Sequence, residues 1–160
     1  LPFFDKRAKS IEYGYFHGYR LIDRQGQRPA FPFGFGLSYT TFTYKNLQIS
    51  QSEISPDGAL NVSVDVTNTG NMAGEEVVQL YVGCDSSRVE RPVKELKGFS
   101  KVHLIPGQTK RVDFLVTARQ LAYYDEQQGK WIVEPLTYSV YVGPSSRTED
   151  LLSVKFGIRV

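Results

Sequence analysis

The side chains best suited to chemistry in this 160-residue chain are carboxylates that occur side by side. Two carboxyl groups set roughly 5–10 Å apart can serve as acid and nucleophile in the hydrolysis of a glycosidic bond. The candidate pairs are Glu75 with Glu76, Asp125 with Glu126, and Glu149 with Asp150. Each pair lies in or beside an expected turn, where acidic side chains are normally solvated. We therefore assign none of these pairs a catalytic role.

Histidine and cysteine do not supply a second kind of site. His17 and His103 are the two histidines and Cys84 is the one cysteine, and their spacing fits no closed zinc site. The sequence has no nucleophile elbow that would place a serine beside either histidine. Gly34 and Gly36 form a Gly-x-Gly, but the third glycine and the following helix of a dinucleotide loop are missing. We predict no catalytic residue, no metal and no cofactor.

The overall charge argues against two classes of partner. The chain has 19 basic and 17 acidic residues, for a net charge of +2. Nucleic acids and acidic membranes call for a strongly basic face, so we expect neither as a partner. No apolar run reaches the length of a membrane span. The chain starts abruptly at Leu1, without an initiator methionine or a signal peptide, and we expect it to be a piece of a longer polypeptide.

The elements that must position these side chains are short strands. Residues 61–67 alternate without a break between valine and polar side chains, as a strand with one dry and one wet face does. Residues 76–83 are apolar on both faces, which is typical of a central or covered strand. Strands joined so closely either pair in antiparallel fashion or face each other across a sandwich.

The number and spacing of the strands indicate the fold class. We expect about seven to nine short strands after residue 41, separated by turns at intervals of about 8–12 residues. This pattern predicts an all-β fold, an immunoglobulin-like or fibronectin type III-like β-sandwich of about seven strands. The fibronectin type III-like form is favoured because the Cys–Trp–Cys pattern of a true immunoglobulin domain is absent. We also expect one helical turn at 118–122 and a buried Trp131.

Residues 1–40 differ from the rest and form an irregular, aromatic-rich N-terminal segment. They hold ten aromatic residues, of the ten Tyr, ten Phe and one Trp in the chain. Glycines and prolines interrupt any long element, although we expect one short strand within 11–21 and a contact of Arg20 with Asp23 or a carbonyl. Exposed rings in such number mark a contact surface. We therefore divide the chain into a docking segment (1–40) and a sandwich (41–160).

Six stretches are distinctive both for their residues and for their order: YFHGYRLIDRQGQRPAFPFG (15–34), FPFGFGLSYTTF (31–42), VDVTNTGNMAGEEVVQLYV (64–82), RPVKELKGFSKVHLIPGQ (91–108), LAYYDEQQGKWIVEP (121–135) and YSVYVGPSS (138–146). Together they resemble the C-terminal region of family 3 glycoside hydrolases, the β-glucosidase and β-xylosidase group. The resemblance covers most of the chain. It departs from the family at Leu136, where a glycine commonly follows the Glu-Pro.

The resemblance implies a fibronectin type III-like domain at the C-terminus of an enzyme that cleaves terminal β-linked sugars with retention. It also implies that the nucleophilic Asp and the acid/base Glu lie before this region, and the sequence has no Ser-Asp-Trp nucleophile motif. The chain would then be a non-catalytic accessory domain whose partners are the catalytic domains of the parent glycosidase. The predicted docking residues are Phe31, Phe33, Phe35 and Tyr39, because aromatic side chains dominate contact energetics.

Two other functions remain open at this point. Tyr123, Tyr124 and Trp131 are aromatic residues that could stack on sugar rings, as in a carbohydrate-binding module. A tyrosine near the start of a late strand is also typical of a sandwich corner, where its hydroxyl bonds back to the chain. A surface adhesion or interaction sandwich would need an exposed edge strand, and that reading leaves FPFGFGLSYT unexplained.

Overall fold

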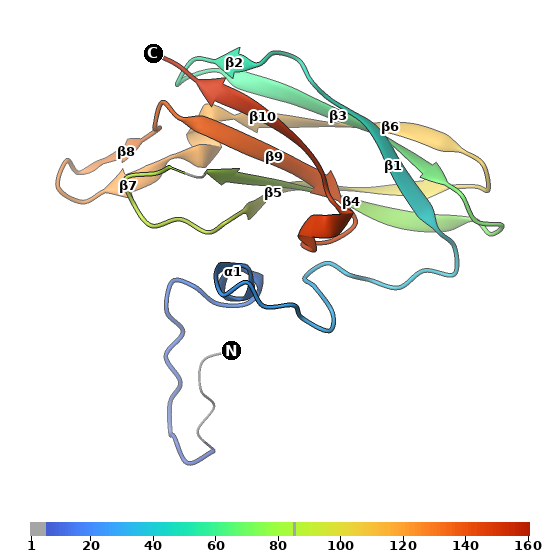
Figure 1. Cartoon of the computed structure of the whole chain (residues 1–160), viewed down its shortest axis with the longest axis horizontal. Helices are drawn as coiled ribbons and strands as arrows, with labels where there is room; N and C mark the ends of the chain where they lie inside the picture. The colour runs from blue at the N-terminus through green and yellow to red at the C-terminus, as the bar shows by residue number, and fades with distance from the viewer. Residues whose placement is uncertain (1–5, 85) are drawn as a thin grey trace.

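The computed structural model describes residues 6–84 and 86–160 and shows two sheets packed face to face (Figure 1). Residues 6–40, here called the arm, lie below the sheets and contain one short helix. The first five residues of the expected docking segment lie outside this description. The helical elements are α1 (Tyr19–Arg24) and the 3-10 turns η1 (Ala118–Leu121) and η2 (Thr148–Asp150). The strands are β1 (Phe42–Ile49), β2 (Glu53–Ile54), β3 (Ala59–Asn68), β4 (Gly74–Cys84), β5 (Glu95–Leu104), β6 (Thr109–Thr117), β7 (Tyr123–Asp125), β8 (Lys130–Ile132), β9 (Thr137–Gly143) and β10 (Leu152–Ile158).

The strands form one sheet of order β1-β3-β6, a second of order β2-β10-β9-β4-β5, and a separate β7-β8 hairpin. Neighbouring strands are antiparallel except for β10 and β2, which run parallel. Strands β3 and β4 belong to different sheets and face each other across the core, which decides between the two arrangements that the sequence allowed. The all-β sandwich prediction is confirmed. The described residues form ten strands rather than about seven, because β2, β7 and β8 have only two or three residues each.

The core lies between the two sheets and follows from the alternation in the sequence. Val62, Val64 and Val66 of β3 have no exposed surface, and Leu80 of β4 and Val140 of β9 face them from the other sheet, equally buried. The polar residues between the three valines point to the outer face of their sheet. The pattern at 61–67 therefore did predict which side chains make the core.

One buried amide holds the corner that follows β3. The side chain of Asn68 accepts hydrogen bonds from the hydroxyl of Thr40 (2.7 Å) and the backbone N–H of Gly70 (3.1 Å). Its amide nitrogen donates to the carbonyl oxygens of Met72 (2.8 Å) and Leu104 (2.9 Å). A buried polar group is tolerated when its hydrogen bonds are satisfied. Asn68 ties the corner to Thr40, before β1, and to Leu104, at the end of β5.

Glu134 is a second buried polar side chain, 1% exposed. Its carboxylate accepts hydrogen bonds from the Ser87 hydroxyl (2.5 Å), the Arg88 backbone N–H (2.9 Å) and the Arg91 guanidinium (3.0 Å). Burial alone would raise the pKa of Glu134, but these three donors hold that pKa below its usual range. Arg91 also donates to the carbonyl of Leu121 (2.8 Å), so the loop after β4 is fastened to the segment before β7.

The sandwich corner is made by Tyr138, not by Tyr123 or Tyr124. The Tyr138 hydroxyl donates to the carbonyl oxygen of Glu134 at 3.0 Å, four residues upstream. Burial raises the pKa of Tyr138 to about 12. Tyr123 and Tyr124 therefore do not form the corner and are part of the β7–β8 hairpin instead.

Two local expectations were wrong. The strand expected within 11–21 is absent, and Tyr19–Arg24 form α1 instead. This six-residue helix starts after Gly18, has no side-chain N-cap, and would be marginal on its own, so contacts with the sandwich must hold it. Trp131 was expected in the core but is 70% exposed, because its hairpin stands outside both sheets.

Candidate docking site

Three ion pairs tie α1 to the sandwich, and that of Arg24 with Glu90 is the most exposed of them. The ammonium of Lys94, 1% exposed, lies 2.7 Å from the carboxylate of Asp23 and also donates to the Thr148 hydroxyl at 3.1 Å. Arg20 lies 3.0 Å from Glu95 at the start of β5, so the expected contact of Arg20 with Asp23 is replaced by one across the interface. Lys94 directly precedes Glu95 at the start of β5, and Thr148 belongs to η2, so the helix is fixed against two parts of the sandwich.

Tyr19 is the aromatic link between the arm and the five-stranded sheet. Its ring stacks on Phe33 with a centroid distance of 5.0 Å and meets the buried ring of Tyr81 edge-on at 5.9 Å. Its hydroxyl accepts a hydrogen bond from the backbone N–H of Leu96 at 2.9 Å. One ring therefore joins α1, the following loop and strands β4 and β5. Aromatic pairs of this geometry add to the free energy gained by burial alone.

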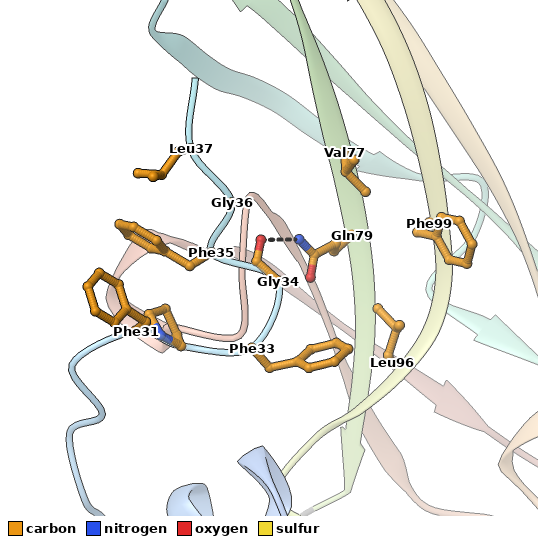
Figure 2. Close-up of a pocket in the computed structure, with 11 residues that line it drawn as sticks. Phe31, Phe33, Gly34, Phe35, Gly36, Leu37, Val77, Gln79, Leu96 and Phe99 are labelled. Atoms are coloured by element: carbon orange, nitrogen blue, oxygen red, sulfur yellow. Dashed lines mark hydrogen bonds between the residues drawn. The ribbon is translucent and has the colours of Figure 1, made fainter. Parts of the chain in front are cut away.

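A buried amide helps to fix the loop that follows the helix, beside the Tyr19–Phe33 stack and a hydrogen bond from the Ser146 N–H to the Phe33 carbonyl oxygen (2.9 Å). The Gln79 side chain, on β4, donates to the carbonyl oxygens of Gly34 (3.1 Å) and Pro144 (2.5 Å), and accepts from the Tyr81 hydroxyl (2.6 Å). Figure 2 shows the bond between Gln79 and Gly34. Gly34 has a φ of 75°, and a Cβ there would lie 2.1 Å from Oε1 of Gln79. Glycine is therefore needed for both the turn and the close approach.

An open apolar groove of about 820 Å³ lies between this loop and the sheet. Residues 31–37 form one wall, and Val77, Leu96 and Phe99 of β4 and β5 form the other, with Gln79 at the base. In Figure 2 the ring of Phe33 points toward Leu96, whereas Phe31 and Phe35 lie on the far side of the loop. Gln79 is the one polar side chain among the described residues that line this groove.

The predicted docking residues have different surroundings. Phe31, 73% exposed, and Phe35 pack on each other at 5.5 Å and line the groove. Phe33 also lines it but is held by its stack on Tyr19. Tyr39 is 94% exposed and lies outside the groove. The structure therefore places three of the four side by side and the fourth apart.

Sequence reasoning missed the wall that the sandwich contributes. Val77 and Phe99 are exposed on the outer face of β4 and β5, beside the arm. The apolar character of both faces of β4 was a signal for Val77, because it indicated that something covers the outer side. Phe99 had no such signal, since β5 mixes polar and apolar residues. Together with Leu37 these side chains enlarge an apolar surface of the kind that marks a contact site.

The carboxylate pair at 75 and 76 is part of strand β4 and not of a turn. Glu75 is exposed and pairs with Lys101 on the neighbouring strand at 2.5 Å. Glu76 points the other way, is half-buried, and accepts a 2.5 Å hydrogen bond from the Tyr44 hydroxyl. Burial raises the pKa of Glu76, although this hydrogen bond acts in the opposite direction. The two carboxylates therefore face opposite sides of the sheet and cannot act on one bond together.

Within residues 6–84 and 86–160, no cluster of His, Cys, Asp and Glu is arranged to hold a metal ion. The helices in this part of the chain are too short or too polar to cross a membrane.

Known proteins with a similar sequence or fold agree on the kind of domain that this chain forms. A model of the fibronectin type III-like domain matches residues 76–146. The chain is 49% identical over 139 residues to thermostable β-glucosidase B of Acetivibrio thermocellus, covering 86% of this chain and 18% of that protein. It is 44% identical over 141 residues to a β-xylosidase of Formosa agariphila, covering 88% of this chain and 19% of that protein.

Solved structures agree with these matches. A β-glucosidase of Kluyveromyces marxianus, in complex with glucose, superposes with a TM-score of 0.76 at 46% identity, over 89% of this chain and 17% of that one. A GH3 β-glucosidase of Bifidobacterium adolescentis superposes with a TM-score of 0.82 at 37% identity, over 91% of this chain and 21% of that one. This chain therefore spans about a fifth of the length of the proteins it matches.

Fold and sequence together define a fibronectin type III-like domain. More particularly, the chain belongs to the fibronectin type III-like domains of family 3 glycoside hydrolases, the group that its motifs resemble.

Proposed function

We propose that this chain is a non-catalytic accessory domain of a β-glucosidase-like glycoside hydrolase and that it docks on the catalytic domains of its parent. The observation that carries the proposal is the apolar groove between residues 31–37 and strands β4 and β5, which the arm presents ready-formed. Relatives about five times as long have the remaining polypeptide to supply the opposing surface. A covalently joined partner is held at high effective concentration, so such a surface need not be large.

The four predicted docking residues are of two kinds under this proposal. Phe33 holds the loop to the sandwich through Tyr19. Phe31, Phe35 and Tyr39 are the rings available to a partner. Burying one such ring contributes about 1.5–3 kcal/mol, and the loop is already ordered by Gln79, so little conformational entropy is lost on docking.

The test compares one substitution in two contexts, the isolated chain and the full-length parent enzyme. Phe35→Ala should lower the melting temperature of the isolated chain only slightly, since the ring is 39% exposed and meets the exposed Phe31 and the Arg147 guanidinium, 5.8 Å from the ring centre. In the parent enzyme the same change should lower the melting temperature by several degrees while substrate preference stays the same. Leu115→Ala is the matched control, because Leu115 is 60% exposed on β6, in the other sheet.

Phe33→Ala serves as a second variant with a different expected result. It should lower the melting temperature in both contexts, because the Tyr19 stack lies within the chain. If Phe35→Ala changes substrate choice in the parent enzyme without changing its stability, the docking role is wrong.

The absence of catalysis is tested directly. The purified chain should release no product from an aryl β-glucoside at any enzyme concentration that the assay tolerates. Turnover that is abolished by substituting a carboxylate of the chain, such as Glu76, would show that these residues form an active site by themselves.

A further inference from the structure

The β7–β8 hairpin carries two exposed rings that the docking proposal does not use. Tyr124 and Trp131 are cross-strand partners, with their ring centroids 5.6 Å apart and their planes at 68°. Tyr124 is 50% exposed and Trp131 is 70% exposed. Tyr123 and Ile132, on the other face of the hairpin, are half-buried. The hairpin therefore presents one aromatic face to solvent and rests on the other.

This hairpin is held in one shape from its tip to its base. At the tip the Asp125 carboxylate accepts hydrogen bonds from the backbone N–H and the side-chain amide of Gln128, both at 2.9 Å. At the base the Arg91 guanidinium lies 5.4 Å from the centre of the Tyr123 ring, and Arg91 is itself fixed by the buried Glu134. A rigid aromatic surface binds a ligand with less loss of conformational entropy than a mobile one.

Two hollows flank Trp131, one of about 550 Å³ and one of about 510 Å³. Both are lined by Trp131, Arg119 and Ala122, which form the ridge between them. Asp57 lines the first hollow, and Gln120 is among the side chains that line the second. None of the described residues lines both these hollows and the docking groove.

The walls of these hollows suit a different ligand from the docking groove. That groove has one polar side chain, whereas the two hollows beside Trp131 are lined by several guanidinium, ammonium, carboxylate and amide groups, among them Arg119, Asp57 and Gln120. A pyranose ring has an apolar face of C–H groups and a rim of hydroxyls that both donate and accept hydrogen bonds. The flat, exposed indole of Trp131 can stack on the apolar face of the sugar, and Arg119, Asp57 and Gln120 can form hydrogen bonds with its hydroxyls.

We propose that Trp131 is the platform of a sugar-binding site that holds a short β-linked oligosaccharide across the two hollows. The exposed ring and its polar flanks carry the assignment to sugars. The narrower choice of β-linked glucose or xylose chains rests on the proposed function, because it assumes that the parent acts on such chains. The site would keep a polymeric substrate near the catalytic domains without taking part in the reaction.

The chain offers a built-in probe for this site, since Trp131 is its one tryptophan. Cellopentaose, laminaripentaose and xylopentaose are each titrated into the isolated chain while the tryptophan emission is recorded. At least one of them should give a saturable change in intensity or wavelength, with a dissociation constant of about 1 mM or tighter. Arg119→Ala keeps the fluorophore and should weaken the same titration several-fold.

Two aromatic variants distinguish sugar binding at Trp131 from nonspecific binding by any exposed aromatic ring. In gels that contain the soluble polymer of the responding sugar, Trp131→Ala should lose retardation, corresponding to a more than tenfold weaker affinity, as for the central aromatic residue of a binding site. Phe99→Ala is the control, because Phe99 is also 70% exposed but lines the docking groove. Phe99→Ala should be retarded as strongly as the unchanged chain, and melting curves confirm that each variant is folded.

The proposal is overturned if none of the three sugars changes the emission, or if retardation survives Trp131→Ala in a folded variant. It is also overturned if Phe99→Ala loses retardation to the same extent. Should Trp131→Ala fail to fold, the emission titration of Arg119→Ala decides, and an unchanged dissociation constant counts against the site. These results are independent of the docking test, which uses Phe35 and the stability of the parent enzyme.

Discussion

Gln79 reaches from strand β4 to the arm and donates a hydrogen bond of 3.1 Å to the carbonyl oxygen of Gly34. The two residues are 45 positions apart, and the approach is close enough to leave no room for a Cβ at Gly34. The bond lies on the outer face of the sheet, beneath the groove. This amide and the missing side chain at Gly34 therefore act together with the Tyr19–Phe33 stack and the hydrogen bond from the Ser146 N–H to the Phe33 carbonyl oxygen (2.9 Å) to position the loop wall of the groove.

Replacing Gly34 by alanine should detach this loop. The new Cβ would lie 2.1 Å from Gln79 Oε1, and alanine at a φ of 75° adds backbone strain. We expect a loss of more than about 2 kcal/mol in the free energy of unfolding. Gly36→Ala is the matched control: its φ is 59°, but a Cβ there meets nothing closer than 3.9 Å. Chemical denaturation measures both, and equal losses would show that strain alone matters.

The buried ammonium of Lys94 should be far more important than the exposed one of Lys101. Lys94→Ala would leave Asp23 without the partner that holds α1, and removing one member of a buried pair costs about 3–5 kcal/mol. Lys101→Ala breaks an ion pair of similar length with both side chains more than half exposed, and should have little effect. Limited proteolysis near 19–24, together with thermal melting, distinguishes the two. Equal protection of the helix in both variants would contradict the expectation.

The sandwich was predictable because burial imposes a local pattern on each strand. Alternation at 61–67 required a strand with one dry face, and Val62, Val64 and Val66 do fill the core. The strand expected at 76–83, apolar on both faces, is the middle of β4, which lies between β9 and β5 in its sheet. Trp131 was misplaced because alternation shows that two faces differ and does not show whether a layer covers either one.

The arm was less predictable because distant residues determine its shape. Helix α1 has neither a capping side chain nor enough length, and it forms because Asp23 and Tyr19 meet partners from the sandwich. Counting aromatics located the segment but not the roles of its rings, so Phe33 and Phe35 seemed equivalent before their neighbours were known. Phe99 could not be predicted for the same reason. The groove forms between two distant chain segments, and neither segment has a sequence pattern that indicates it.

Asn68 should be among the least replaceable residues of the sandwich. Asn68→Ala removes four hydrogen bonds and leaves the buried carbonyl of Leu104 and the N–H of Gly70 without their side-chain partner. A loss of about 3 kcal/mol or more in unfolding free energy is expected from such unsatisfied groups. Asn61→Ala, on the exposed face of the same strand, should change stability by less than about 0.5 kcal/mol. Urea denaturation of the two variants is the measurement.

Glu134 should make the chain less stable in acid. Its hydrogen bonds to Ser87, Arg88 and Arg91 lower its pKa in the folded chain below the usual value of 4.5. A carboxylate with a lowered folded pKa stabilises the fold fully above its unfolded pKa, and that contribution is lost as pH falls through the folded value. Glu134→Gln should therefore be much less stable than the unchanged chain at pH 7, and the difference should shrink below about pH 4.5.

Glu76→Gln is the control, because its effect on stability should change with pH in the opposite direction to that of Glu134→Gln. Burial raises the pKa of Glu76, so the protonated carboxyl suits its half-buried site and its stabilising contribution is lost as pH rises through the folded pKa. The glutamine variant should therefore gain relative to the unchanged chain between acid and neutral pH, whereas Glu134→Gln loses over the same range. Urea denaturation of the three proteins at several pH values between about 3 and 7 follows both trends. If the two variants change in the same direction, then general acid denaturation, and not these two carboxyl groups, accounts for the pH dependence.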